Sequence, residues 1–287
     1  MKIIKIIIFI CIFFALLSLF SFYFIVRPVF RIHSSITPKD LNIQYENVQF
    51  KTDDNIIIKG WFLKSKNPSA KTIILLHGYP ADKGDILPSR AFLVKNFNLL
   101  LIDFRYLGES GGFYSSAGVN EILDLKAAIK YLQTKNIHEV GVWGLSLGAA
   151  TSLLAATNTP EIKAIVAEAP YAKLDWLTSE YYSIPIFNDI MGNLFKLWAR
   201  LLLGINVSEI QPAQSIQQIN IPVLLIFYQR DNIISDRHRL LMKSISENRK
   251  NISILFIKNK NHGQLFENYQ NIINSFFERN LYARNAN

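Results

Sequence analysis

The hydrophobic pattern of the chain begins with a long segment that carries no charge. From Ile6 to Val26 leucine, isoleucine, phenylalanine and valine dominate. A helix of about 21 residues, rising roughly 1.5 Å per residue, would cross a hydrocarbon core about 30 Å thick. The pattern therefore predicts a single-pass transmembrane helix, and we assign residues 1–34 to this anchor and its flank.

A cleaved secretory signal peptide is the alternative interpretation of this segment, because a basic start precedes the apolar run. The run is longer than a usual signal core, and no A-x-A-like cleavage site follows it, which favours a retained anchor. Two basic residues lie on each side of the run: Lys2 and Lys5, then Arg27 and Arg31. Because short basic starts usually stay in the cytoplasm, we expect the rest of the chain on the extracytoplasmic side.

After the anchor, strand patterns alternate with helical patterns. Two strands, at 42–52 and 55–64, predict an antiparallel start. Later strands such as "KTIILLHG" and "NLLLIDFR" are apolar without interruption, which is typical of strands buried on both faces of a sheet. Helical patterns lie at 87–96, 119–135, 147–156, 237–248 and 264–279. This succession predicts an α/β domain over residues 35–287, with a mainly parallel central sheet flanked by helices.

Residues 171–220 interrupt the alternation. They show no clear strand, are rich in aromatic residues and leucine, and lie between two predicted core strands. We interpret them as a helical cap insertion over one edge of the sheet. Two roles remain open for its apolar residues: packing on the sheet, or lining an apolar binding site in which Trp176, Phe195 and Trp198 would bind substrate.

The pentapeptide "GLSLG" at 144–148 stands between a predicted strand, 139–144, and a helical pattern. A residue at the apex of such a turn is held in a strained conformation and projects beyond the carboxyl edge of the sheet, where ligands bind. Glycines two positions before and after the apex let strand and helix pack closely. The pattern predicts Ser146 as a nucleophile.

A serine nucleophile needs a base, and the base needs an orienting carboxylate. Asp231 follows the strand that ends in "FYQ", and His262 follows the last predicted strand. The order Ser146, Asp231, His262 is the order expected for a nucleophile elbow on this type of sheet. These three residues are therefore the predicted catalytic triad.

Other residues compete for these roles or complete them. Glu168 and Asp175 are alternative acids, and His77 is an alternative base that precedes the elbow. The oxyanion formed in acyl transfer needs two backbone N–H donors. We expect them from Leu147, directly after the nucleophile, and from Tyr79, in the loop after the "LLHG" strand.

Taken in order, these motifs resemble those of the α/β-hydrolase superfamily. The matching stretches are "HGYP", "DFRYLGESGG", "GLSLGAA", "PVLLIFYQRDNIIS" and "NHGQLF". With its anchor and short cap, the chain looks most like the membrane-anchored Bem46-type branch and the ABHD-type lipid hydrolases and depalmitoylases. The resemblance implies a serine hydrolase and a structural role for Asp103 and Arg105. One departure is that Tyr228, Gln229 and Arg230 replace the usual glycine before the acid.

The charge and the cysteine content of the chain limit the kinds of ligand and partner that it is expected to bind. The net charge of +9 comes from 31 basic and 22 acidic residues, but no long basic block indicates nucleic acid. Cys11 is the only cysteine and lies in the anchor, so the remainder can form no disulfide and offers no thiol nucleophile or cysteine metal site. We expect no metal or other cofactor, and membrane lipids as partners of the N-terminal helix.

The predicted substrate is a carboxylic ester or thioester of an apolar acyl chain. A serine peptidase or amidase on the same three residues is one alternative, although the insertion shows no acidic cluster for a peptide amino terminus. A non-catalytic membrane interaction protein is another, and the complete serine, aspartate and histidine set argues against it.

Overall fold

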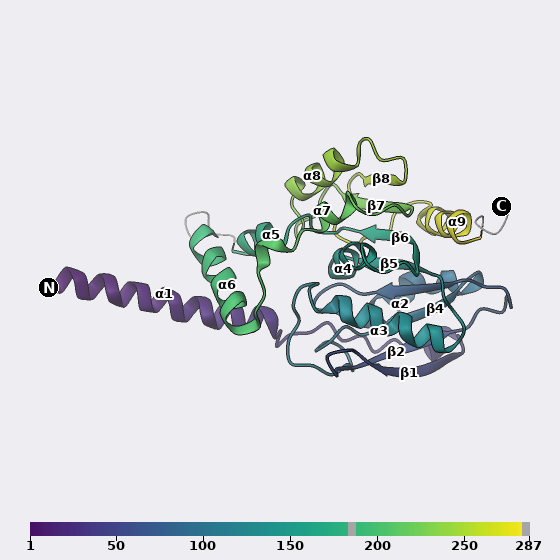
Figure 1. The fold of residues 1–287 in the computed structure, drawn as a ribbon, viewed down its shortest axis with the longest axis horizontal. Helices are drawn as coiled ribbons and strands as arrows, with labels where there is room; N and C mark the ends of the chain where they lie inside the picture. The colour runs from purple at the N-terminus through teal and green to yellow at the C-terminus, as the bar shows by residue number, and fades with distance from the viewer. Residues whose placement is uncertain (183–187, 283–287) are drawn as a thin grey trace. The chain divides into compact units, whose positions relative to one another are not determined.

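The computed structural model describes residues 1–182 and 188–282 (Figure 1). By their contacts these residues divide into two compact units. We call Met1–Val29 with Lys173–Gln211 the anchor unit, and Phe30–Ala172 with Pro212–Asn287 the sheet unit. The predicted domain boundary at residue 34 stays a prediction.

Within the described part of the sheet unit, eight strands form one sheet. In chain order they are β1 (Tyr45–Lys51), β2 (Ile57–Leu63), β3 (Thr72–Leu76), β4 (Asn98–Ile102), β5 (Val140–Leu145), β6 (Ile162–Glu168), β7 (Val223–Tyr228) and β8 (Ile252–Ile257). Their order across the sheet is β1-β2-β4-β3-β5-β6-β7-β8. The pairs β1–β2 and β2–β4 are antiparallel and the other pairs are parallel, which confirms the predicted sheet.

Helices bury both faces of this sheet, and this explains why the central strands are apolar throughout. One face packs against α3 (Glu121–Thr134), α4 (Leu147–Ala156), α7 (Pro212–Ile216) and α8 (Asp236–Ser246). The other face packs against α2 (Lys83–Arg90), the 3-10 turn Ala91–Lys95 and α9 (Tyr269–Leu281). The predicted helices flanking a mainly parallel sheet are confirmed.

Two helix starts differ from the predicted ones by four or five residues, for local reasons. The helix α2 begins at Lys83, earlier than the predicted residue 87, because the Asp82 side chain accepts hydrogen bonds from the first amides of the helix. The helix α9 begins at Tyr269, later than the predicted residue 264. Residue Asn268 before it has φ 58°, and residues 258–268 form the loop that carries His262.

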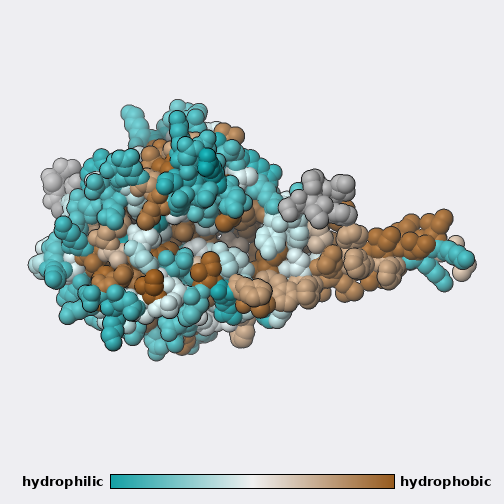
Figure 2. All heavy atoms as spheres, turned by 180° about the vertical axis from the view of Figure 1, so that it is seen from behind, coloured by the Kyte–Doolittle hydropathy of each residue, from teal (hydrophilic) through white to brown (hydrophobic). Residues whose placement is uncertain are grey.

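The described residues of the anchor unit are mainly helical. It contains α1 (Lys2–Val26), α5 (Leu174–Glu180), α6 (Asn188–Leu203) and the 3-10 turn Val207–Glu209. The helix α1 is long and apolar enough to cross a membrane, and Figure 2 shows its hydrophobic surface. The described residues of the predicted insertion contain no strand, as the sequence indicates.

Candidate active site

Ser146 occupies the sharp turn between β5 and α4. Its backbone has φ 52° and ψ −108°, a conformation that residues with a side chain rarely adopt. Its amide donates a hydrogen bond of 2.8 Å to the carbonyl oxygen of Glu168 in β6, and its own carbonyl accepts one of 3.0 Å from the Ala150 amide. These two bonds hold the serine backbone in place at the carboxyl end of β5.

The two glycines of the pentapeptide are required because the backbones of β5, α4 and β3 approach each other closely at these positions. A Cβ atom at Gly144 would overlap the backbone of Gly148. A Cβ atom at Gly148 would lie 2.5 Å from the carbonyl oxygen of Leu76 in β3. The small residues that the motif requires therefore have a direct steric cause.

Asp231 and His262, predicted from distant parts of the sequence, are in direct contact. The Oδ2 atom of Asp231 lies 2.8 Å from Nδ1 of His262. The other carboxylate oxygen accepts hydrogen bonds from the amides of Ile233 and Ile234, at 2.9 and 2.8 Å, which fix the carboxylate in its loop. Since an ionised carboxylate only accepts hydrogen bonds, Nδ1 carries the shared proton, and in the neutral imidazole Nε2 is the basic nitrogen.

The loops that carry the histidine and the predicted oxyanion donors border the serine turn. A Cβ atom at Gly263, next to His262, would lie 3.2 Å from Cδ1 of Leu145, the residue before the serine. A Cβ atom at Gly78 would lie 3.5 Å from Cβ of Ser146. Tyr79 directly follows Gly78. The other predicted donor, Leu147, begins α4, where first-turn amides have no carbonyl within the helix to donate to.

The alternative base, His77, has both ring nitrogens engaged. The ring is fully buried, its Nε2 accepts a hydrogen bond from the Phe104 amide at 3.0 Å, and its Nδ1 lies 2.7 Å from the Gly78 carbonyl oxygen. Burial lowers the pKa of His77, which keeps the ring neutral. This histidine ties the end of β3 to the loop after β4 and has no nitrogen left for a proton transfer.

The alternative acid Glu168 belongs to a buried network. Its carboxylate pairs with Arg90 at 3.0 Å and accepts hydrogen bonds from the hydroxyls of Tyr228 and Tyr269. Burial, together with the negative charge of Glu168, raises the pKa of both tyrosines, so both hydroxyls stay protonated donors. The guanidinium of Arg90 also lies 4.1 Å from the ring centre of Trp143.

This network accounts for the unusual sequence before the acid. Tyr228 is one of the three residues that replace the usual glycine of the family. Its hydroxyl donates a hydrogen bond to the Glu168 carboxylate and so connects the end of β7 to β6. Sequence reasoning identified neither Arg90 nor Tyr269 as partners of this carboxylate. Arg90 lies in α2, 78 residues before Glu168, and no local sequence pattern indicates a buried ion pair. The other alternative acid, Asp175, lies in α5 of the anchor unit.

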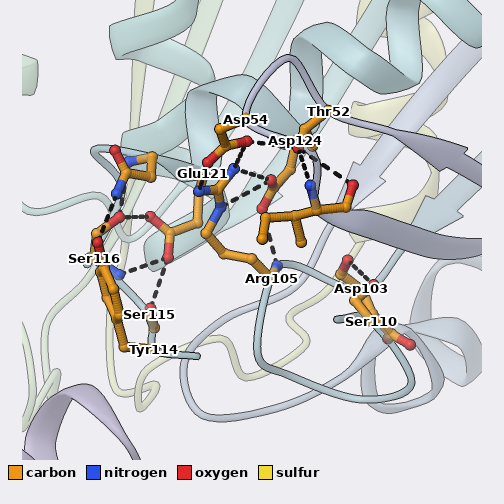
Figure 3. A network of polar contacts seen from close by, with 12 residues as sticks. Thr52, Asp54, Asp103, Arg105, Ser110, Tyr114, Ser115, Ser116, Glu121 and Asp124 are labelled. Atoms are coloured by element: carbon orange, nitrogen blue, oxygen red, sulfur yellow. Dashed lines mark hydrogen bonds and ion pairs between the residues drawn. The ribbon is translucent and has the colours of Figure 1, made fainter. Parts of the chain in front are cut away.

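The two residues expected to have structural roles are fixed in polar networks. Asp103 accepts hydrogen bonds from the backbone amides of Lys83 and Glu109, both at 2.8 Å, and pairs with the Lys83 ammonium at 2.6 Å. Figure 3 shows Arg105 held between the carboxylates of Asp54 and Asp124. These contacts assign both side chains to loop structure and leave neither of them available for chemistry.

A segment after the anchor lies on the loop of the predicted oxyanion donor. We call residues 30–36 the strap. The amide of Ile32 donates a 3.0 Å hydrogen bond to the carbonyl oxygen of Pro80, next to Tyr79. His33 and Ser34 both contact the Asp82 carboxylate, at 2.7 and 3.2 Å. The strap was not anticipated, because its contacts to the Pro80 carbonyl oxygen and to the Asp82 carboxylate join segments that are distant in the sequence and leave no local signature.

The predicted substrate-binding residues all lie in the anchor unit. Phe195 is only 7% exposed and packs edge-on against Phe22 of α1, with ring centres 5.0 Å apart. The indole N–H of Trp198 donates a 2.9 Å hydrogen bond to the Ser18 hydroxyl, also in α1. Trp176 lies in α5. Two of these three residues therefore contact the N-terminal helix, and substrate binding by all three stays a prediction.

A mostly parallel sheet of this strand order, with a serine on a sharp turn after its fifth strand, is the architecture of the α/β-hydrolases. The chain belongs to the α/β-hydrolase superfamily. The esterase Pf2001 of Pyrococcus furiosus is similar in structure, with a TM-score of 0.71 and 30% identity. The match covers 88% of this chain and 97% of the esterase.

Sequence comparisons point in the same direction. Protein bem46 of Schizosaccharomyces pombe is 25% identical over 215 residues, which cover 72% of this chain and 67% of bem46. The thiohydrolase apmlB of Arthrinium phaeospermum is 31% identical over 132 residues, which cover 44% of this chain and 43% of that protein. The sequence profile of the X-Pro dipeptidyl-peptidase (S15) family matches residues 75–184. The chain thus spans about two thirds of bem46 and less than half of the thiohydrolase.

Proposed function

We propose that this α/β-hydrolase is a membrane-anchored serine hydrolase that cleaves a carboxylic ester or thioester of an apolar acyl chain. In this proposal Ser146 is the nucleophile, His262 the base and Asp231 the orienting carboxylate. The observation that carries it is the 2.8 Å contact between Asp231 and His262, on loops that border the strained serine turn. The helix α1 is retained as the anchor, with the sheet unit on the extracytoplasmic side.

The reaction proceeds in two halves. Nε2 of His262 takes the proton from the Ser146 hydroxyl while Oγ attacks the substrate carbonyl carbon. The tetrahedral intermediate then expels the alcohol or thiol, which receives that proton as the bond from carbon to oxygen or sulfur breaks. In the second half, His262 deprotonates a water molecule that attacks the acyl-enzyme. The bond from the acyl carbon to Oγ then breaks, and the imidazolium returns the proton to Ser146 as the carboxylic acid leaves. The Asp231 carboxylate stabilises the imidazolium in both halves.

The backbone amides of Leu147 and Tyr79 are proposed to stabilise the oxyanion. The Leu147 amide lies at the N-terminus of α4, which is the positive end of the helix dipole, and this position stabilises a developing negative charge. The proximity of Gly78 to Ser146 supports a contribution from the adjoining Tyr79 amide. No metal is needed for this chemistry, because the protonated imidazole and the two amides supply the required positive charge.

The strap leads to a prediction about the oxyanion loop. Replacing Ile32 with proline removes the amide that donates to Pro80. We expect kcat to fall by roughly tenfold with little change in KM, because a small displacement of the loop weakens oxyanion stabilisation. Steady-state kinetics on a soluble ester measure this. Ile32→Ala, which keeps the amide, is the matched control, and equal kcat values for the two variants would show that the strap does not act on the loop.

The ester assignment has a specific competitor. Similarity to the P. furiosus esterase and to a thiohydrolase supports acyl esters or thioesters. The S15 profile match over residues 75–184 supports a peptidase or amidase instead. Both use the same nucleophile and base, so only the substrate distinguishes them.

A chain-length series tests the substrate class. We expect kcat/KM on p-nitrophenyl esters to rise from acetate to a medium-length acyl chain. Each methylene buried in an apolar pocket contributes about 0.8 kcal/mol, so three methylenes would raise kcat/KM by more than about tenfold. A profile that peaks at acetate would contradict an apolar acyl site. Faster cleavage of aminoacyl amides than of any ester would instead establish the peptidase alternative.

A further inference from the structure

The helix α6 carries both buried and exposed apolar residues. One side is buried within the anchor unit and contains Met191, Phe195 and Ala199. The other is exposed: Ile190, Leu197 and Leu201 are 50%, 45% and 64% accessible. Their spacing of seven and four residues places these three on one line along the helix. A helix of a water-soluble domain would normally carry polar residues there.

After the first residue of α6, the half-buried Asn188, the polar residues of the helix are confined to a narrow remaining arc. They are Asp189, Asn193, Lys196 and Arg200, of which all but the half-buried Lys196 are exposed. A wide apolar face beside a narrow arc containing basic residues is typical of helices that lie in a membrane interface. Long basic side chains there can reach the headgroups while their stems cover apolar surface.

The buried side of α6 rests on the last turns of α1. Phe195 packs on Phe22, and Trp198 donates its indole N–H to the Ser18 hydroxyl. The hydroxyl of Tyr182, which follows α5, lies 3.0 Å from the hydroxyl of Ser21. Ser18 and Phe22 are almost completely buried within the anchor unit, whereas most of the preceding turns of α1 are exposed. The contact thus covers one side of α1 from Ser18 onward, whereas Phe20 and Tyr23 on its other side stay exposed.

This contact fixes the depth of α6 relative to the membrane. If the covered part of α1 stayed in water, only residues 6–17 of the uncharged run would remain for the bilayer. Twelve residues span about 18 Å, and counting from Lys2 about 24 Å, whereas the hydrocarbon core is about 30 Å thick. The turns that α6 covers must therefore enter the membrane in part, and α6 enters with them.

From this geometry we propose that α6 is a second membrane-contacting helix, whose exposed apolar face is seated in the lipid leaflet nearest the end of α1. The inference rests on the retained anchor of the proposed function. A lipid leaflet is the occupant that the structure favours, because the exposed face of α6 belongs to the same unit as the exposed apolar surface of α1, and basic residues border it. The cap and the anchor then form one membrane-seated unit.

Labelling at single cysteines tests the proposal in the full-length chain. Cys11 is the only natural cysteine, so Cys11→Ser gives a background without thiols. Leu197→Cys and Leu201→Cys report on the apolar face, and Asn193→Cys, exposed on the polar arc of the same helix, is the matched control. Each variant is reconstituted in nanodiscs of phosphatidylcholine and phosphatidylglycerol and treated with a membrane-impermeant maleimide, or with an environment-sensitive dye in the presence of spin-labelled lipids.

We expect the positions 197 and 201 to react about tenfold or more slowly than position 193, and their dyes to be quenched by acyl-chain spin labels. Equal rates and no quenching would place α6 in water and overturn the proposal. Slow reaction without quenching, together with crosslinked dimers, would identify a second copy as the occupant and also overturn it.

The labelling is repeated in the Ser146→Ala variant, because the depth of α6 in the membrane does not depend on catalysis. Quenching in that variant supports the proposal even if no hydrolase activity is found. A purified chain whose mass lacks residues 1–26 would instead remove the premise of a retained anchor and overturn the proposal. Fluorophosphonate reaction of each single-cysteine variant that retains Ser146 reports that the sheet unit is folded.

Discussion

Replacing Ser146 with alanine is expected to abolish covalent labelling by a fluorophosphonate probe and to lower kcat by roughly four to six orders of magnitude. The loss is this large because the triad residues act as a unit, and without the nucleophile only oxyanion stabilisation and substrate binding remain. The fold should be unaffected, because alanine and serine have a similar energetic cost in this backbone conformation. Alanine also keeps the backbone hydrogen bonds to Glu168 and Ala150. Gel-based probe labelling and single-turnover kinetics measure the two effects.

Ser152→Ala is the matched control for this variant. Ser152 lies in α4, the helix that follows Ser146, is fully buried, and its hydroxyl donates to the Ala149 carbonyl oxygen at 2.7 Å. We expect it to label as the wild type does. Undiminished labelling of a folded Ser146→Ala protein would show that another residue is the nucleophile and would end the proposed mechanism.

The sequence predicts the framework of this protein because its signals are local. Uninterrupted apolar strands reveal a sheet covered on both faces, and the pentapeptide at 144–148 encodes a turn whose glycines have no room for a side chain. Asp231 and His262 could be proposed because each follows a predicted strand, and parallel strands bring their carboxyl ends to one edge.

The remaining features depend on contacts between distant segments. The pairing of Arg90 with Glu168 joins α2 to β6 and is set by the three-dimensional arrangement of the sheet, not by a local pattern. The strap binds through the backbone amides of Ile32 and Ser34 and through the His33 side chain, and its partners lie almost fifty residues later in the sequence, so no local pattern indicates these contacts. The packing of α6 on α1 also joins distant segments: the sequence left open whether the aromatic residues of the insertion pack on the sheet or line a binding site, and did not indicate that Phe195 and Trp198 contact α1.

The two carboxylates at the ends of β6 and β7 should respond to neutralisation in opposite ways. Asp231→Asn is expected to lower kcat by about 10⁴-fold, because an amide no longer fixes the imidazole tautomer or stabilises the imidazolium. Its Tm should stay close to that of the wild type, since the amide oxygen can still accept from the Ile233 and Ile234 amides. Thermal unfolding and kinetics on the same preparation give both values.

Glu168→Gln is expected to do the reverse. Neutralising this carboxylate leaves the guanidinium of Arg90 buried without its counter-charge, and breaking a buried pair costs about 3–5 kcal/mol of folding free energy. For a chain of this size that corresponds to a Tm lower by roughly 6–10 °C. The kcat of the folded enzyme should remain within about tenfold of wild type, because the backbone carbonyl of residue 168 still accepts from the Ser146 amide. A stable but inactive Glu168→Gln protein, beside an active Asp231→Asn protein, would transfer the role of triad acid to Glu168.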